Sequence, residues 1–357
     1  MPKAPEAAPP LTPREGGRPR VGQQLRRWRP SSRLGRALAA LGAVALVVAL
    51  VLRAPSAAHD FARAFANLHV DRLYWLAPAL VAEYLSFVAF AAIQRLLFSA
   101  GGVHPPLRLL LRLSVASSGL RALLPVGALP SSGWLFGEFR QLGIDSPLAL
   151  FVVLASGFVS TVCLLELVIL GAAIAGATSP VLLAVCFVVL SAGSAGFVAA
   201  VHRLGAIERH AAGRGAIARA LRRLVRLASG VARLQPGWRT GALSFGAAAA
   251  NWLADLVCLI AAFALLGVAI PWRDLLFAYA GSQLAGSVVP LPGGLGAVEG
   301  GLIGVLDLAG VPIGAGLAVA VLYRAITYWG VAAFGGIELF FLARHPLTAA
   351  SLDPPRS

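Results

Sequence analysis

The chain of 357 residues is 58% hydrophobic and only 13% charged, and its mean hydropathy of +0.80 is atypical of soluble globular proteins. Its apolar runs are continuous and rich in Ala, Leu and Val, which excludes a transmembrane barrel of short alternating strands. The net charge of +15 comes from arginines in a tail and one loop beside apolar runs, so it indicates membrane topology and anionic lipid, not nucleic acid, as the partner. The composition predicts an all-α polytopic membrane protein.

The reactive side chains give no sign of a metal site, a cofactor or a disulfide. Cys163, Cys186 and Cys258 fall in apolar runs without metal-type spacing, and the six histidines are scattered. The sequence holds no Gly-x-x-x-x-Gly-Lys-Ser/Thr run for nucleotide binding, and its only lysine is Lys3. We therefore expect no cofactor and no enzymatic activity, and any transport should be passive or coupled to an ion.

The first part of the chain consists of a tail, an apolar run and an amphipathic segment. Residues 1–34 hold seven prolines and many arginines without apolar periodicity, which predicts a disordered basic tail in the cytoplasm. Ala37 to Leu52 is a first span; Arg53-Ala-Pro-Ser-Ala-Ala after it resembles a cleavage site, but the long tail favours an uncleaved anchor. Ser56 to Val70 is expected to lie along the outer interface.

The middle of the chain alternates full spans with a broken segment. Leu73 to about Phe98 is a span, whereas Leu107 to Gly143 is predicted to form two short helices because prolines and glycines interrupt its middle. Two further spans run from Pro147 to about Ala175 and from Pro180 to Val201.

The segment from His202 to Thr240 is strongly basic, with nine arginines and a single acidic residue, Glu208. It is either a basic amphipathic helix on the inner leaflet or a solvated loop. Both interpretations place Arg203 to Arg239 in the cytoplasm, next to anionic lipid.

The last third of the chain repeats the order of span, broken segment and span. Gly241 to Gly267 is a span that carries Asn251 and Asp255 on one helical face. Val288 to Gly310 combines two prolines, a Gly-rich turn and a carboxylate within apolar surroundings. Because irregular backbone at membrane depth is tolerated only where protein or a polar cavity surrounds it, this stretch is predicted to be a site. Pro312 to Ala343 suffices for one tilted span or a broken one.

A shift of 167 positions superposes the two broken segments and the spans on either side of them. Units 73–176 and 241–343 therefore each consist of a span, a broken hairpin and a span. Three full crossings lie between the hairpins, and an odd number makes the repeat inverted. The superposed breakers are Pro125 with Pro292, Gly127 with Gly294, Gly133 with Gly300, Gly137 with Gly304, and Gly143 with Gly310.

The arginine distribution then predicts six full spans plus two re-entrant hairpins, with both termini in the cytoplasm and the protein in the cell inner membrane. The membrane domain covers residues 35–345, and residues 346–357 form a short tail. The hairpins enter from opposite sides and meet near the midplane, an arrangement that indicates a transporter-type site. The sequence leaves the oligomeric state open.

The run Pro290-Leu-Pro-Gly-Gly-Leu-Gly-Ala-Val-Glu299, with the downstream Leu322-Tyr-Arg324 and Tyr328-Trp329, resembles the membrane domain of bacterial lysylphosphatidylglycerol synthases and their stand-alone, flippase-like relatives. Leu124-Pro125 and Gly137-Glu-Phe-Arg140 resemble that family's first-half signature. The resemblance covers roughly residues 37 to 343. It implies a protein that translocates or handles lipid, or lipid carriers of glycan pathways. The soluble synthase domain has no counterpart here, so synthesis of the lysyl lipid is not expected.

The Gly-rich turn of the second hairpin is a candidate anion site. Pro292 is followed by Gly293, Gly294 and Gly296, which expose backbone N–H groups at the start of a helix and so favour a lipid phosphate. Alternatively, the glycines at 296, 300 and 304 allow close helix packing. The anion-binding role and the packing role are compatible.

Glu299 and Arg324 are the sharper candidates, because an ionisable residue inside a span usually faces a cavity or a partner. Either they form a purely structural ion pair, or Arg324 binds the head-group phosphate directly. Tyr323 and Tyr328 are candidates for hydrogen bonds to head-group oxygens. The first hairpin contributes the corresponding candidates Pro125, Glu138 and Arg140.

Three functions remain open at this point, of which the third is an assembly scaffold without transport. The first is a flippase-like protein in which the two hairpins form a polar groove for the head group of a phospholipid, an aminoacyl-phosphatidylglycerol or a polyprenyl-phosphate-linked lipid. The second is a membrane subunit or glycosyltransferase-like factor in polyprenyl-linked glycan assembly.

Overall fold

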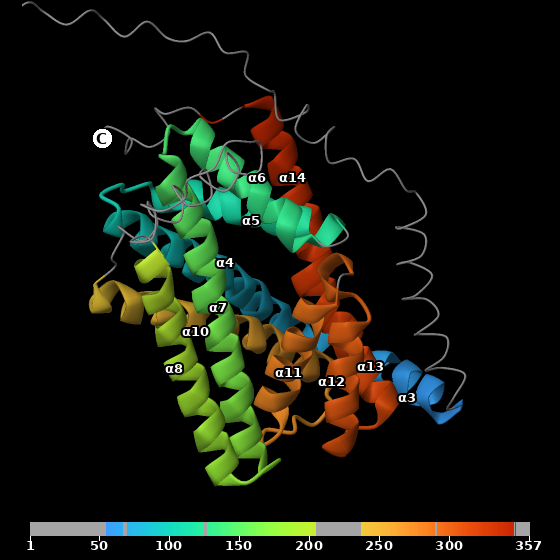
Figure 1. Ribbon diagram of the computed structural model, residues 1–357. Coiled ribbons are helices and arrows are strands. Elements are labelled where there is room, and N and C mark those ends of the chain that lie inside the picture. The colour runs from blue at the N-terminus through green and yellow to red at the C-terminus, as the bar shows by residue number, and fades with distance from the viewer. Residues whose placement is uncertain are drawn as a thin grey trace, which may run out of the picture.

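The protein is seen here as a computed structural model that describes residues 55–66, 70–124, 127–204, 237–289, 291–345 and 347. Within these ranges the chain is helical and has no strand (Figure 1). The elements are α3 (Pro55–Ala66), η1 (Val70–Trp75), α4 (Leu76–Ala100), α5 (Leu107–Leu123), α6 (Ala128–Gln141), α7 (Ser146–Ala175), α8 (Pro180–Leu204), α10 (Trp238–Leu266), α11 (Leu275–Val288), η3 (Pro292–Gly294), α12 (Ala297–Leu308), α13 (Ile313–Arg324), η4 (Ala325–Gly330) and α14 (Val331–Arg344).

Four helical stretches in the described part are long and apolar enough to cross a membrane: Asp71–Ala100, Ser146–Ala175, Trp238–Leu266 and Ile313–Arg344. They confirm the prediction of an all-α membrane protein. Helix α8 adds an apolar segment, Pro180–Gly193. The predicted tails, the first span at 37–52 and most of the basic segment at 202–240 lie outside the described residues.

Helices α4 and α10 pack against each other along their length. Ala79, Ala82, Ala261 and Ala262 are all buried, and such small side chains allow two helices to approach closely. The thiol of Cys258 on α10 lies 3.3 Å from the carbonyl oxygen of Ala79 on α4. Helices α5 and α7 also pack on α4, and α7 and α13 also pack on α10.

Two of the long apolar stretches are each followed by a pair of shorter helices: Asp71–Ala100 by the α5–α6 hairpin, and Trp238–Leu266 by the α11–α12 hairpin. Shifted by 167 positions, α5 falls on α11 and α6 on α12, with the ends agreeing within two residues. The α5–α6 hairpin lies at the top of Figure 1, and the α11–α12 hairpin lies in the lower half. In the second hairpin the helices are separated by η3 and by Gly293, Gly294 and Gly296, whose φ angles are 55°, 66° and 83°. Such positive values favour glycine, and they shape the turn between the end of α11 at Val288 and the start of α12 at Ala297.

Helix α14 packs against the first hairpin, and helix α7 packs against the second. Helix α14 lies on α5, where a Cβ at Gly335 would meet the Cα of Gly119 at 2.5 Å. Helix α7 lies on α11, where a Cβ at Gly171 would meet the backbone nitrogen of Phe277 at 2.6 Å. In both places glycine permits backbone contact that any side chain would prevent.

The final span is neither straight nor fully broken. Helix α13 continues through the π-helical segment η4 into α14, and a wide π turn inside a helix is frequently found at a functional site. Arg324, directly before this segment, and Tyr328, within it, organise the site described next.

Candidate functional site

Arg324 ties the end of α13 to the irregular turn of the second hairpin. Its Nε atom lies 2.7 Å from Oε1 of Glu299, and its Nη2 atom donates to the carbonyl oxygen of Gly293 at 2.7 Å. The other carboxylate oxygen of Glu299 accepts the backbone N–H of Gly296 at 2.6 Å, at the N-terminus of α12. One ion pair therefore holds the turn, the start of α12 and the end of α13 together.

Tyr328 joins this second hairpin to the first. The guanidinium of Arg324 lies over the Tyr328 ring, 4.4 Å from its centroid, and the Tyr328 hydroxyl donates to the carbonyl oxygen of Ala122 at 2.9 Å. A Cβ at Gly293 would lie 2.1 Å from the same ring. Elements η3 and α5 also pack directly against each other. The tips of the two hairpins thus meet at Tyr328, which lies in η4.

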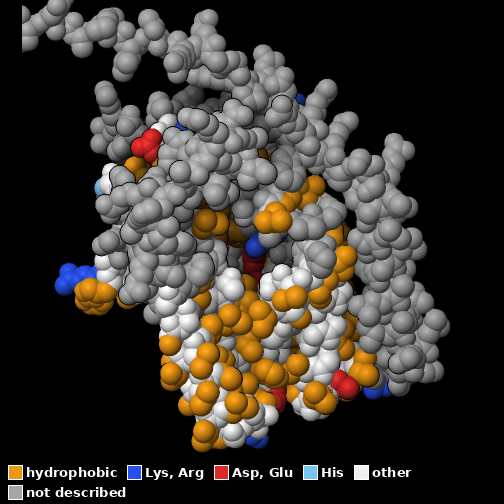
Figure 2. All heavy atoms as spheres, in the orientation of Figure 1, with side chains coloured by type: hydrophobic (Ala, Val, Ile, Leu, Met, Phe, Trp, Pro, Cys, Tyr) orange, Lys and Arg blue, Asp and Glu red, His pale blue; other side chains and the backbone are white. Residues whose placement is uncertain are grey.

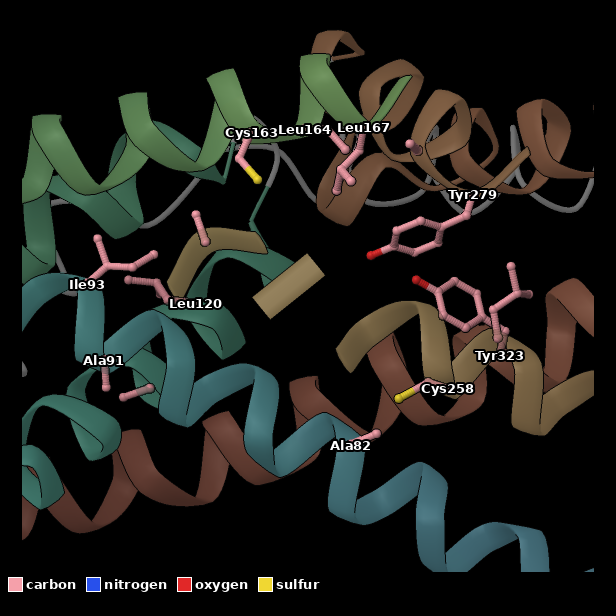
Figure 3. Packing of buried hydrophobic residues seen from close by; sticks show 14 of the residues in the cluster. Ala82, Ala91, Ile93, Leu120, Cys163, Leu164, Leu167, Cys258, Tyr279 and Tyr323 are labelled. Atoms are coloured by element: carbon pink, nitrogen blue, oxygen red, sulfur yellow. The ribbon is translucent and has the colours of Figure 1, made fainter. Parts of the chain in front are cut away.

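A second polar cluster is centred on the carboxylate of Asp255, which is buried on α10. Its Oδ2 atom accepts hydrogen bonds from the hydroxyl of Tyr279 at 2.7 Å, the hydroxyl of Tyr323 at 2.7 Å and the amide of Gln283 at 2.8 Å. Figure 3 shows the hydroxyl groups of Tyr279 and Tyr323 turned toward the same space. Three donors on one oxygen allow a buried carboxylate to persist among apolar helices.

Glu83 and Cys258 complete this cluster from the side of α4 and α10. The ligand-type atoms of Glu83, Asp255 and Cys258 all lie within 4.8 Å of one another, so they could hold a metal ion. The Cys258 thiol lies 3.6 Å from Oε2 of Glu83. No spacing in the sequence indicated this group, because its members come from two helices that are far apart in the chain.

Arg121 adds a positive charge from the first hairpin. It lies in the last turn of α5, next to Ala122, and within electrostatic range of both Asp255 and Arg324. Its side chain is exposed to solvent. Figure 2 shows a hollow in the middle of one face, with atoms of basic and acidic side chains inside it.

The site residues predicted from the sequence are only partly brought together. Glu299, Arg324 and Tyr328 meet as described, Tyr323 belongs to the Asp255 cluster instead, and Pro292 is buried in η3. Gly294 packs on the backbone of Gly286. Pro125 lies outside the described residues.

Glu138 and Arg140 take no part in these contacts. Glu138 is buried on α6, and its Oε1 atom has no hydrogen-bond partner among the described residues. Arg140 is exposed and donates to the carbonyl oxygen of Ile144, so it ties the end of α6 to the connection that leads to α7. A glycine-packing face at 296, 300 and 304 is likewise not formed, because a Cβ at Gly300 or Gly304 would meet no described atom within 4 Å.

Sequence reasoning missed four contributors to the site: Arg121, Cys258, Tyr279 and Gln283. Arg121 precedes the proline break by only four residues, so an arginine at the tip of a re-entrant hairpin was the available signal. Gln283 offered a weaker signal, as a polar residue in the apolar segment that precedes the turn of the second hairpin.

Comparison with known proteins gives one match. The family profile described as the lysylphosphatidylglycerol synthase TM region matches residues 37–335. No curated protein and no solved structure matches the chain.

Proposed function

The chain belongs to the lysylphosphatidylglycerol synthase transmembrane-region family, and from this premise we propose that it is a flippase-like protein that translocates or handles a phosphate-bearing membrane lipid. The observation that carries the proposal is the polar centre where the tips of the two hairpins meet. It holds two arginines, Arg121 and Arg324, and the carboxylates of Glu299 and Asp255 inside a bundle whose outer helices are apolar. Ionisable groups at such depth are characteristic of substrate pathways.

The proposed topology consists of two inverted repeats with six full spans. The protein lies in the cell inner membrane, and both termini are in the cytoplasm. The support for this topology is the element order, in which α5 and α6 correspond to α11 and α12, and the reciprocal packing of α14 on α5 and of α7 on α11. The basic segment from Arg203 to Arg239 would then contact the anionic inner leaflet.

In the proposed mechanism the polar head group enters the hollow while its acyl chains stay in the lipid. A phosphate is attracted by arginine, and hydroxyl and amide groups around Asp255 offer further hydrogen bonds. Large apolar side chains on the outside, such as Leu182 and Val188 of α8 and Leu253 of α10, are exposed and suit contact with acyl chains. The ion pair of Glu299 and Arg324 keeps the second hairpin in place.

Reconstituted vesicles provide the test. The full chain is incorporated into liposomes that contain a fluorescent phosphatidylglycerol, and a membrane-impermeant quencher reports the fraction of probe that changes leaflet. We expect quenching beyond the half that the outer leaflet holds, and loss of this extra quenching in Glu299→Gln. The matched control is Glu338→Gln, which breaks the more exposed pair with Arg112 and should translocate normally.

Equal quenching in protein-free and protein-containing vesicles, for phosphatidylglycerol and for a polyprenyl-phosphate probe alike, would contradict the proposal. The competing function, a membrane subunit or glycosyltransferase-like factor in glycan assembly, predicts a different result. Incubation with a labelled polyprenyl-phosphate sugar would then give a new covalent product, whereas a flippase leaves the lipid chemically unchanged.

A further inference from the structure

The two arginines of the polar centre differ in what their guanidinium groups already bind. Arg324 is 8% exposed, pairs with Glu299, donates to the Gly293 carbonyl and stacks on Tyr328. Its charge is neutralised at contact distance and two of its donors are occupied. An incoming phosphate would have to displace Glu299 and release the turn that the pair holds.

Arg121 has none of these contacts. No hydrogen bond or ion pair to its side chain is present in the part of the chain that the structure describes, and the side chain is exposed to solvent. Asp255 lies within electrostatic range, but its Oδ2 atom is already occupied by Tyr279, Gln283 and Tyr323. The guanidinium of Arg121 therefore keeps a complete set of donors.

The backbone that carries Arg121 is nevertheless held firmly. The Tyr328 hydroxyl binds the carbonyl oxygen of the next residue, Ala122, and a Cβ at Gly127 would lie 2.1 Å from the carbonyl oxygen of Arg121 itself. The position also lies in the last turn of α5, where the helix dipole favours a cation. A fixed backbone with an unoccupied guanidinium is a preorganised receptor for an anion.

The surroundings of Arg121 suit an anion with apolar chains. Leu123 and Leu129, on either side of the same hairpin tip, are 52% and 71% exposed. A guanidinium matches the oxygens of a phosphate in a bidentate manner, and a lysine does so less well. Resting on the proposed function, we propose that Arg121, and not Arg324, receives the phosphate diester of the lipid head group.

The test measures binding by the purified full chain in a neutral detergent. Dioctanoyl-phosphatidylglycerol, dioctanoylglycerol and inorganic phosphate are titrated separately by calorimetry against the natural protein, Arg121→Gln, Arg121→Lys and Arg108→Gln. We expect Arg121→Gln to weaken binding of the phospholipid at least tenfold, and Arg121→Lys to restore it in part. Arg108→Gln is the matched control, because Arg108 is exposed on the same helix and undergoes the same change of side chain. This variant should bind like the natural protein.

Thermal unfolding of each variant checks that Arg121→Gln is folded. Arg121→Lys keeps the positive charge, so partial recovery of binding in this variant tests the site even if Arg121→Gln is unstable. Unchanged phospholipid binding by a folded Arg121→Gln would overturn the inference. So would equal binding of dioctanoylglycerol, which lacks the phosphate. Competition by inorganic phosphate with no preference for the lipid would assign the site to free phosphate and also overturn it.

The inference and the proposed function can fail separately. Translocation that persists in Arg121→Gln, together with unchanged binding, leaves the flippase proposal standing and removes Arg121 from it. Phospholipid binding that depends on Arg121, in a protein that translocates no probe, supports the receptor and contradicts translocation.

Discussion

Arg324 and Glu299 are 25 residues apart in the sequence and form an ion pair of 2.7 Å in which the side chains are only 10% and 17% exposed. A second pair, Arg112 with Glu338, joins α5 to α14 at 2.6 Å with side chains 45% and 21% exposed. The two pairs have similar geometry and different environments. Burial therefore decides what each contributes.

Replacing Glu299 by Gln is expected to lower the free energy of unfolding by about 3 to 5 kcal/mol, because Arg324 is left buried without its counter-charge. Glu338→Gln is the matched control and should cost about 1 kcal/mol or less. Thermal unfolding in detergent compares the two. A larger loss for Glu338→Gln than for Glu299→Gln would contradict the assignment.

The contact of Gly335 with Gly119 predicts a position-specific effect of alanine. A Cβ at Gly335 would meet backbone atoms of α5, so Gly335→Ala should force α14 and α5 apart and destabilise the protein by about 1 to 3 kcal/mol. The adjacent Gly336 has no described atom within 4 Å of such a Cβ. Gly336→Ala should therefore be neutral or slightly stabilising. Similar melting temperatures for the two variants would show that the helices do not pack in this way.

The hydrogen bonds to Asp255 can be removed without altering the packing of the rings. Tyr279→Phe should cost roughly 1.5 to 3 kcal/mol, because the carboxylate loses one of its donors. Tyr84→Phe is the control, since Tyr84 is 57% exposed on α4. Thermal unfolding of both is the measurement, and a Tyr279→Phe protein as stable as the control would refute the role of this hydroxyl.

Gly293→Ala tests the turn of the second hairpin by a different route. The residue has a φ of 55°, and the Cβ of an alanine there would lie 2.1 Å from the Tyr328 ring. The ring must therefore move, which breaks the hydrogen bond of its hydroxyl to the Ala122 carbonyl. We expect loss of lipid translocation together with a lower melting temperature. Gly300→Ala, three residues into α12 with open space around it, is the comparison and should retain both. Normal translocation by Gly293→Ala would show that the turn tolerates rearrangement.

Helix content, family and the position of both hairpins could be predicted from the sequence because hydropathy and helix breakers are local properties. The approach of Glu299 to Arg324 was predictable as well, since few partners exist for a charge inside a span. Whether Arg324 serves as a structural ion-pair partner or as a phosphate ligand could not be predicted, because this depends on the contact of Arg324 with the Gly293 carbonyl.

The cluster around Asp255 could not be predicted for a related reason. Asp255 and its three donors come from α10, α11 and α13, and only the packing of these helices brings the donors to one oxygen atom. Tyr323 was expected to face a head group and instead faces Asp255. Arg121 was overlooked because it has no acidic residue at helical spacing, and that lack of a local partner is the property that makes it a candidate receptor.

The π-helical segment η4 sets the rotational phase of the last span. Before it, α13 packs on α3 and on α12 of the second hairpin; after it, α14 packs on α5 of the first. Since each α-helical residue turns the chain by about 100°, deleting one residue within Ala325–Gly330 would rotate α14 by about that angle relative to α13. Gly335 would then leave Gly119, and Glu338 would leave Arg112. The wider turn is thus what allows one continuous helix to fit two hairpins at once.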